Sequence, residues 1–195
     1  MRMRDARPEE LAAIRELTID AYREYESLMD PAAWAGLRNA IERTFEPDAA
    51  PATRIVAEVN GTLLGSVMLY PPGADPYGGA LGPLPWPEVR LLAVAPEARG
   101  RGIGLALMEE CTRRAAASGA LVIGIHTSRS MKVAIEMYRR MGFRRAPDYD
   151  FRPKGAERVE AFTLDLRQRR QPATPRPDSS SGSADLGDAG VVTDR

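Results

Sequence analysis

A glycine-rich turn between an apolar run and a helical segment constrains this chain more than any other feature. The turn is Arg99-Gly100-Arg101-Gly102-Ile103-Gly104, the apolar run covers residues 89–94, and helical periodicity begins near Gly102. A glycine turn that leaves a strand and opens a helix presents unpaired backbone N–H groups at the positive end of the helix dipole. The pattern therefore predicts a phosphate or pyrophosphate site at this turn.

The spacing excludes two common nucleotide motifs. A Walker A loop needs Lys and then Ser or Thr after its last glycine, whereas Ile103 and Gly104 follow Gly102 here. A dinucleotide fingerprint needs Gly-x-Gly-x-x-Gly, and the glycines at 100, 102 and 104 have a different spacing. The phosphate-bearing ligand must therefore belong to another class.

Taken as Arg-x-x-Gly-x-Gly, the turn resembles the coenzyme A loop of the GNAT superfamily of N-acetyltransferases. Upstream, residues 88–94 resemble the central strand of that family. Downstream, residues 134–138 followed by Gly142-Phe143 resemble its C-terminal helix. The resemblance covers roughly residues 1–167, with its specific motifs at 88–104 and 134–143. It implies an α/β (α+β) fold with a central mixed, mostly antiparallel twisted sheet of six to seven strands, flanking helices, and splayed parallel strands 4 and 5.

Periodicity and turn residues predict the elements along the chain. Strands are expected at 1–6, 54–58, 62–70, 88–94 and 121–127, with a closing pair at 143–151 and 158–166. Helices are expected from Pro8, from Asp30-Pro31, from Gly102 to about Ser118, and at 131–141. Residues 71–87 hold six prolines and four glycines, and we expect a long loop near the acceptor side.

One domain is expected at 1–167, followed by a disordered tail at 168–195. The tail is rich in proline and serine and has few large apolar residues, so burial cannot offset its ordering entropy.

Composition narrows the class of partner and compartment. Acidic and basic residues balance at 27 each, which gives no support for a nucleic-acid partner. Cys111 is the single cysteine, and no Cys and His cluster suits a metal. The polar N-terminus and the lack of a long apolar run predict a cytoplasmic protein without a membrane segment. A homodimer is possible, and nothing in the sequence decides it.

The resemblance implies acetyl-CoA as co-substrate, no metal, and transfer of its acetyl group to a primary amine of a small molecule or peptide. Cys111 lies on the predicted cofactor helix, away from the site, so we expect direct transfer in a ternary complex. Two alternatives remain open. One is a non-catalytic acetyl-CoA sensor, and the other is acetylation of protein N-termini or aminoacyl-tRNA. The identity of the acceptor is not determined by the sequence.

The expected cofactor contacts lie in the turn and in the strand before it. Backbone N–H groups of the turn are candidates to bind the pyrophosphate, with Arg99 and Arg101 either adding charge or facing solvent. The resemblance implies that the N–H of Leu92 points at the thioester carbonyl and that Val94 pairs with the pantetheine arm. The predicted cofactor-binding residues are Leu92, Ala93, Val94, Arg99, Gly100, Arg101, Gly102, Ile103, Gly104 and Tyr138.

Three residues are candidates for proton transfer. Glu88 stands where some family members carry a catalytic glutamate, and it is either the general base or a solvated residue at a strand start. His126 or water are the other candidates to take the amine proton. Tyr138 matches the family tyrosine that protonates the leaving thiolate, the alternative being a buried aromatic residue. Met131 replaces an asparagine frequent in the family, so a contact to pantetheine is lost or supplied by nearby serines.

Five aromatic residues are candidates to line the acceptor pocket, although large aromatic residues more often belong to the core. They are Tyr22, Tyr25, Trp34, Tyr77 and Trp86.

Overall fold

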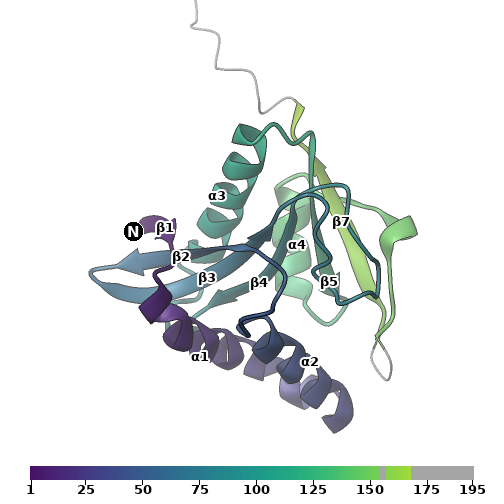
Figure 1. Ribbon diagram of the computed structural model, residues 1–195. Helices are drawn as coiled ribbons and strands as arrows, with labels where there is room; N and C mark the ends of the chain where they lie inside the picture. The colour runs from purple at the N-terminus through teal and green to yellow at the C-terminus, as the bar shows by residue number, and fades with distance from the viewer. Residues whose placement is uncertain (154–156, 168–195) are drawn as a thin grey trace, which may run out of the picture.

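A seven-stranded mixed sheet forms the centre of the molecule, and the computed structural model describes residues 1–153 and 157–167 (Figure 1). The spatial order is β1-β2-β3-β4-β5-β7-β6, and only the β4–β5 pair is parallel. The strands are β1 (Arg2–Asp5), β2 (Thr53–Val59), β3 (Thr62–Tyr70), β4 (Glu88–Val94), β5 (Val122–Ser128), β6 (Arg144–Arg145) and β7 (Val159–Asp165). The predicted fold class is thereby confirmed. The predicted disorder of 168–195 lies outside the described residues.

Two helices cover each face of the sheet (Figure 1). On one face lie α1 (Leu11–Tyr22) and α2 (Pro31–Arg43), and on the other lie α3 (Ile103–Ala117) and α4 (Lys132–Arg140). The start of α2 follows from its sequence, because the Asp30 side chain accepts a hydrogen bond from the Ala33 N–H at 2.9 Å and proline stands at the first helical position. The larger core lies under α3 and α4, and a smaller one lies under α1 and α2.

A bulge in β4 opens the centre of the sheet. Leu91 has a φ of 51°, in the left-handed region, and neither Leu91 nor Leu92 has a register partner on β3 or β5. The parallel ladder between β4 and β5 contains only Glu88↔Gly124 and Val89↔Ile125. Beyond Val89 the two strands separate, which confirms the predicted splay.

The closing strand pair is shorter than the sequence predicts. Residues 147–149 form a 3-10 helix between β6 and an isolated bridge at Phe151↔Val159. Pro147 has no N–H to give to a ladder, and the Asp150 carboxylate accepts the Ala161 N–H at 2.9 Å in place of a backbone carbonyl. The segment therefore leaves the sheet and crosses its α1–α2 face near His126.

No helix in the described part of the chain is long and apolar enough to span a bilayer.

Candidate active site

The glycine turn is an open bend with unpaired backbone N–H groups. Gly100 and Gly102 have φ values of 72° and 76°, a conformation that non-glycine residues rarely adopt, and nothing lies within 4 Å of a Cβ built on either. Gly102 is the N-cap of α3, and the first hydrogen bond of this helix runs from the Ala106 N–H to the Gly102 carbonyl. Among the described residues, no backbone acceptor is found for the N–H groups from Gly100 to Leu105. These groups fit a pyrophosphate.

Three elements converge where this turn meets the splay. A Cβ built on Gly104 would lie 3.6 Å from Val94, 4.0 Å from Leu92 and 3.9 Å from the Met137 sulfur on α4. The first turn of α3 thus lies directly over the free part of β4. The predicted pyrophosphate and pantetheine segments are consequently contiguous.

The two arginines of the turn differ in their surroundings. Arg99 donates to the Glu24 carboxylate and to the Ala21 carbonyl, both at 2.8 Å, and so ties the turn to the end of α1. Arg101 is exposed and forms no ion pair within the described residues. Of these two arginines, only Arg101 has a guanidinium that no protein group engages and that is free to bind a ligand.

Tyr138 lies on the inner face of α4 with its ring 5.9 Å from that of Phe143. Burial, together with the nearby Tyr22 and Tyr25, raises the pKa of Tyr138 well above its ordinary value, so the phenol is protonated at neutral pH. Within the described chain its hydroxyl has no hydrogen-bond partner, and it is not among the buried side-chain atoms that lack one. The hydroxyl is therefore accessible and able to donate to a ligand.

Glu88 is buried, not solvated, although it stands at a strand start. Its side chain is 1% exposed. Oε1 accepts from the Tyr77 hydroxyl at 2.8 Å and lies 2.6 Å from Nδ1 of His126, and Oε2 accepts from the Trp86 indole at 3.1 Å. A proton can reach Glu88 only through these partners. The structure thus brings Glu88 and His126, two alternative candidates, into one hydrogen-bonded unit.

The partners of His126 fix the number of protons that it shares. Nε2 lies 2.9 Å from the Tyr149 carbonyl, which only accepts, so Nε2 carries a proton. One further proton must lie between Nδ1 and the Glu88 carboxylate, on either group. Glu88 and His126 therefore form one hydrogen-bonded carboxylate–imidazole pair.

Two segments meet above this unit through their aromatic rings. Tyr77 and Trp86 come from the 71–87 loop, and Tyr149 and Phe151 come from the β6–β7 segment. The Trp86–Tyr149 and Tyr77–Phe151 ring centroids are 4.4 and 5.0 Å apart. These rings form a partly buried wall on the α1–α2 face of the splay.

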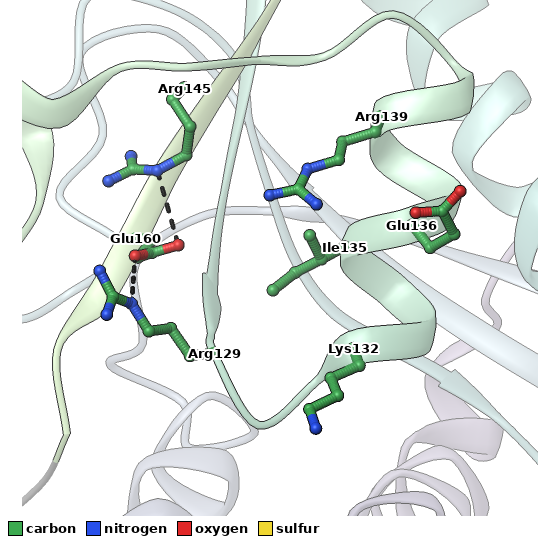
Figure 2. Close-up of a pocket in the computed structure, with 7 residues that line it drawn as sticks. All are labelled: Arg129, Lys132, Ile135, Glu136, Arg139, Arg145 and Glu160. Atoms are coloured by element: carbon green, nitrogen blue, oxygen red, sulfur yellow. Dashed lines mark hydrogen bonds and ion pairs between the residues drawn. The ribbon is translucent and has the colours of Figure 1, made fainter.

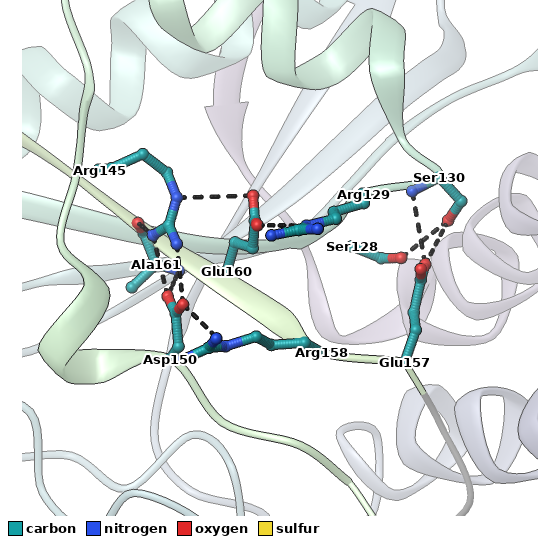
Figure 3. Close-up of polar contacts among 9 residues, drawn as sticks. All are labelled: Ser128, Arg129, Ser130, Arg145, Asp150, Glu157, Arg158, Glu160 and Ala161. Atoms are coloured by element: carbon teal, nitrogen blue, oxygen red, sulfur yellow. Dashed lines mark hydrogen bonds and ion pairs between the residues drawn. The ribbon is translucent and has the colours of Figure 1, made fainter.

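An ion-pair network holds the β6–β7 side of the wall (Figure 3). Asp150, next to Tyr149, accepts two hydrogen bonds from Arg145 and pairs with Arg158 at 3.0 Å. Burial acts to raise the pKa of Asp150, but Arg145 and the Ala161 N–H together lower it. The carboxylate is therefore ionised at neutral pH and fixes the Tyr149 carbonyl against His126.

A separate groove of about 580 Å³ lies between α4 and the β6–β7 edge of the sheet (Figure 2). Glu160 stands between Arg129 at 2.5 Å and Arg145 at 3.5 Å, which satisfies its charge. The groove is lined by Arg129, Lys132, Ile135, Glu136, Arg139, Arg145 and Glu160. None of these is a predicted site residue, so this groove is distinct from the candidate active site.

Several residues of the site have no signal in the sequence. Gly124 is needed because a Cβ there would overlap the Trp86 indole and come within 2.5 Å of Glu88. Tyr149 contributes only its backbone carbonyl to His126, which no side-chain motif encodes. Arg90 has no motif either, and its guanidinium lies 4.4 Å from the centre of the Tyr77 ring. Two serines stand near Met131 in the chain, and the hydroxyls of Ser128 and Ser130 form a hydrogen bond with each other at 2.8 Å.

A sheet opened between two parallel strands, with free N–H groups at one end of the opening, defines a class of proteins that bind a phosphate-bearing ligand along a strand edge. The sequence model described as the acetyltransferase (GNAT) family matches residues 11–143. The chain belongs to this family.

Curated relatives share this part of the chain. A mycothiol acetyltransferase from Cellulomonas flavigena is 34% identical over 143 residues, covering 72% of this chain and 40% of the relative. An acetyltransferase from Yersinia pestis is 32% identical over 110 residues, covering 56% of this chain and 69% of the relative. The chain thus spans less than half the length of that mycothiol acetyltransferase.

The fold matches solved structures over nearly their whole length. The PaiA N-acetyltransferase from Thermoplasma acidophilum, solved in complex with coenzyme A, aligns with a TM-score of 0.60 and 16% identity. The alignment covers 84% of this chain and 98% of that one. At this identity the likeness establishes the fold.

Proposed function

We propose that this protein transfers the acetyl group of acetyl-CoA to a primary amine of a small molecule or peptide, directly in a ternary complex. The observation that carries the proposal is the opening between β4 and β5 with a free N–H turn at its end. Coenzyme A in the PaiA structure supports acetyl-CoA as the ligand. The name of the mycothiol acetyltransferase relative supports a small-molecule acceptor. A cytoplasmic location and a homodimer stay predictions.

The cofactor-binding roles follow the chain through the opening. The N–H groups of residues 100–104 hold the pyrophosphate, and Ala93 and Val94 pair with the pantetheine arm as a neighbouring strand does. The Leu92 N–H donates to the thioester oxygen, where negative charge develops during attack. Arg99 keeps the turn in place through its contacts with α1.

Each proton in the reaction has a route. The amine nitrogen attacks the thioester carbon, the C–S bond breaks, and the electron pair leaves on sulfur. The amine proton passes through the Tyr77 hydroxyl to the Glu88 carboxylate, because Tyr77 lies 2.8 Å from Glu88, and it is later released to solvent. Tyr138 gives its proton to the thiolate and is reprotonated from solvent.

Steady-state kinetics with an amine panel test this proposal. Thiol release from acetyl-CoA, with both substrates varied, gives intersecting double-reciprocal lines for direct transfer. Glu88→Gln lowers kcat by about 100-fold and Tyr138→Phe by about 10-fold, since removal of a proton-transfer group costs on this order. Binding of CoA survives in both.

Glu109→Gln, on the exposed side of α3, is the control and leaves kcat unchanged. Unchanged kcat in both Glu88→Gln and Tyr138→Phe would remove the two assignments. Tight binding of acetyl-CoA without thiol release for any amine would instead favour the sensor.

A further inference from the structure

Arg90 carries a positive charge that the protein itself does not compensate. Its guanidinium donates to the Pro76 carbonyl and lies over the Tyr77 ring, with 4.4 Å between the guanidinium carbon and the ring centroid. No carboxylate of the described residues lies within 4.0 Å of it. A half-buried cation whose nearest groups are a carbonyl and an aromatic face has unused capacity for an anion.

The nearest acidic residues are already occupied. Both oxygens of Glu88, two positions earlier on the strand, are taken by its three partners. The Asp75 carboxylate, next to Pro76, accepts the N–H groups of Tyr77 at 3.2 Å and Gly79 at 2.6 Å. Neither carboxylate therefore forms an ion pair with Arg90.

The free N–H groups of Arg90 are accessible. A guanidinium has five N–H donors, and one of its nitrogens is engaged by Pro76. Among buried side-chain nitrogens and oxygens of the described chain, only Nε of Arg54 lacks a partner. The remaining nitrogens of Arg90 are therefore open to solvent and to a ligand.

Arg90 lies on the same strand as the proposed site of acetyl transfer. Arg90 pairs with Met68, which packs in the core under α1 and α2, so its side chain lies on the acceptor face of the sheet. Leu92, whose N–H is proposed to bind the thioester oxygen, follows two residues later, on the other side of the bulge at Leu91. An amine attacking there places a group a few bonds away within reach of the guanidinium.

We propose that Arg90 determines acceptor specificity by binding a carboxylate that the acceptor carries a few bonds from its amine, as in an amino acid or a peptide with a nearby acid. This inference rests on the proposed acetyl transfer and names its substrate class. A planar guanidinium matches a carboxylate with two parallel hydrogen bonds. The positive charge also disfavours the ammonium form of the amine and so favours the neutral nucleophile.

Matched acceptors test the proposal. Rates of acetylation are measured for α-amino acids and for the corresponding α-amino amides, and each kcat/KM is expressed per neutral amine because loss of the carboxylate charge lowers the pKa of the amine. The wild-type protein has a kcat/KM about 10- to 100-fold higher for the acids, the range of a hydrogen bond to a charged group. Arg90→Met brings the acid-to-amide ratio to about one, and Arg90→Lys keeps part of the preference.

Arg54→Met is the control, because Arg54 also lies over an aromatic ring, Phe45, and donates to a backbone carbonyl, that of Thr44. It leaves the acid-to-amide ratio unchanged, whatever it does to stability. Calorimetry of the acid and the amide against the protein saturated with CoA gives a second readout, in which the preference for the acid disappears in Arg90→Met.

Two outcomes overturn the inference in distinguishable ways. A wild-type protein that acetylates the amides as well as or better than the acids keeps the proposed function and loses the role of Arg90. A protein that binds acetyl-CoA but releases no thiol with any amine of the panel, and binds acid and amide alike, loses both.

Discussion

Gly124 shows how a single missing side chain makes room for the buried unit of this protein. It lies on β5 opposite Glu88 in the parallel ladder, and its N–H donates to the Pro87 carbonyl at 2.9 Å. The Trp86 indole and the Glu88 carboxylate occupy the space where a Cβ would stand. Close contact between strand and carboxylate therefore depends on glycine at this position.

Gly124→Ala is expected to destabilise the fold by about 1–3 kcal/mol, because the added methyl group must displace Trp86 or Glu88. Urea unfolding followed by tryptophan fluorescence measures the change. Gly36→Ala is the control, since nothing lies within 4 Å of a Cβ there and Gly36 is inside α2. That variant is expected to gain about 0.5–1 kcal/mol. Equal stability of Gly124→Ala and the wild type would contradict this packing.

The sequence was informative for residues that belong to motifs and silent for those that meet through the fold. Glu88 and Tyr138 are identifiable from their positions in the strand and helix patterns. Contact between Glu88 and His126 depends on two strands adjacent in the sheet but 38 residues apart in the chain. No periodicity predicts which partners a buried carboxylate finds, or that the carbonyl of Tyr149 will be one of them.

Among the elements, the segment between β6 and β7 is anchored by polar side-chain contacts. Its 3-10 helix at residues 147–149 has no backbone ladder, so Asp150 supplies the connection to β7 through Arg145 and the Ala161 N–H. Asp150 is 1% exposed in its side chain, which makes the charge expensive to leave unpaired. The position of the aromatic wall follows from this single carboxylate.

Asp150→Asn is expected to lower the free energy of unfolding by about 1–3 kcal/mol, since Arg145 loses one of its two carboxylate partners and keeps only Glu160 at 3.5 Å. Faster hydrogen exchange of the amides at 146–151 is expected with it. Asp148→Asn is the control, an exposed acidic residue in the same 3-10 helix. Equal exchange in the two variants would show that Asp150 does not anchor the segment.

Elements with strong local signals were predicted to within a residue or two. The bounds of β4 agree with the prediction, and α2 begins where Asp30 and Pro31 place it. The strand predicted at 143–151 was too long, because hydrogen bonds of the Asp150 side chain replace the backbone ladder there. Strand propensity carries no information about such side-chain bonds. Where an element ends thus depends on tertiary partners more than on its own residues.

For the whole molecule, function depends on several segments meeting at one opening in the sheet. The splay of β4 from β5, the first turn of α3, the inner face of α4 and the end of α1 all border it. Each segment alone is an ordinary piece of an α/β protein. Together they place free backbone N–H groups, the protonated phenol of Tyr138 and the buried Glu88–His126 pair around the opening between β4 and β5.

Calorimetric titration of acetyl-CoA into the purified protein tests the central claim, that the glycine turn and the splay form its binding site. We predict saturable binding of one molecule per chain, weakened at least about 10-fold in Gly102→Val, because a β-branched residue cannot keep the positive φ that aims the N–H groups. Far-UV circular dichroism checks that the variant is folded. Absence of saturable binding to the wild type, or equal affinity of a folded Gly102→Val, would contradict the account.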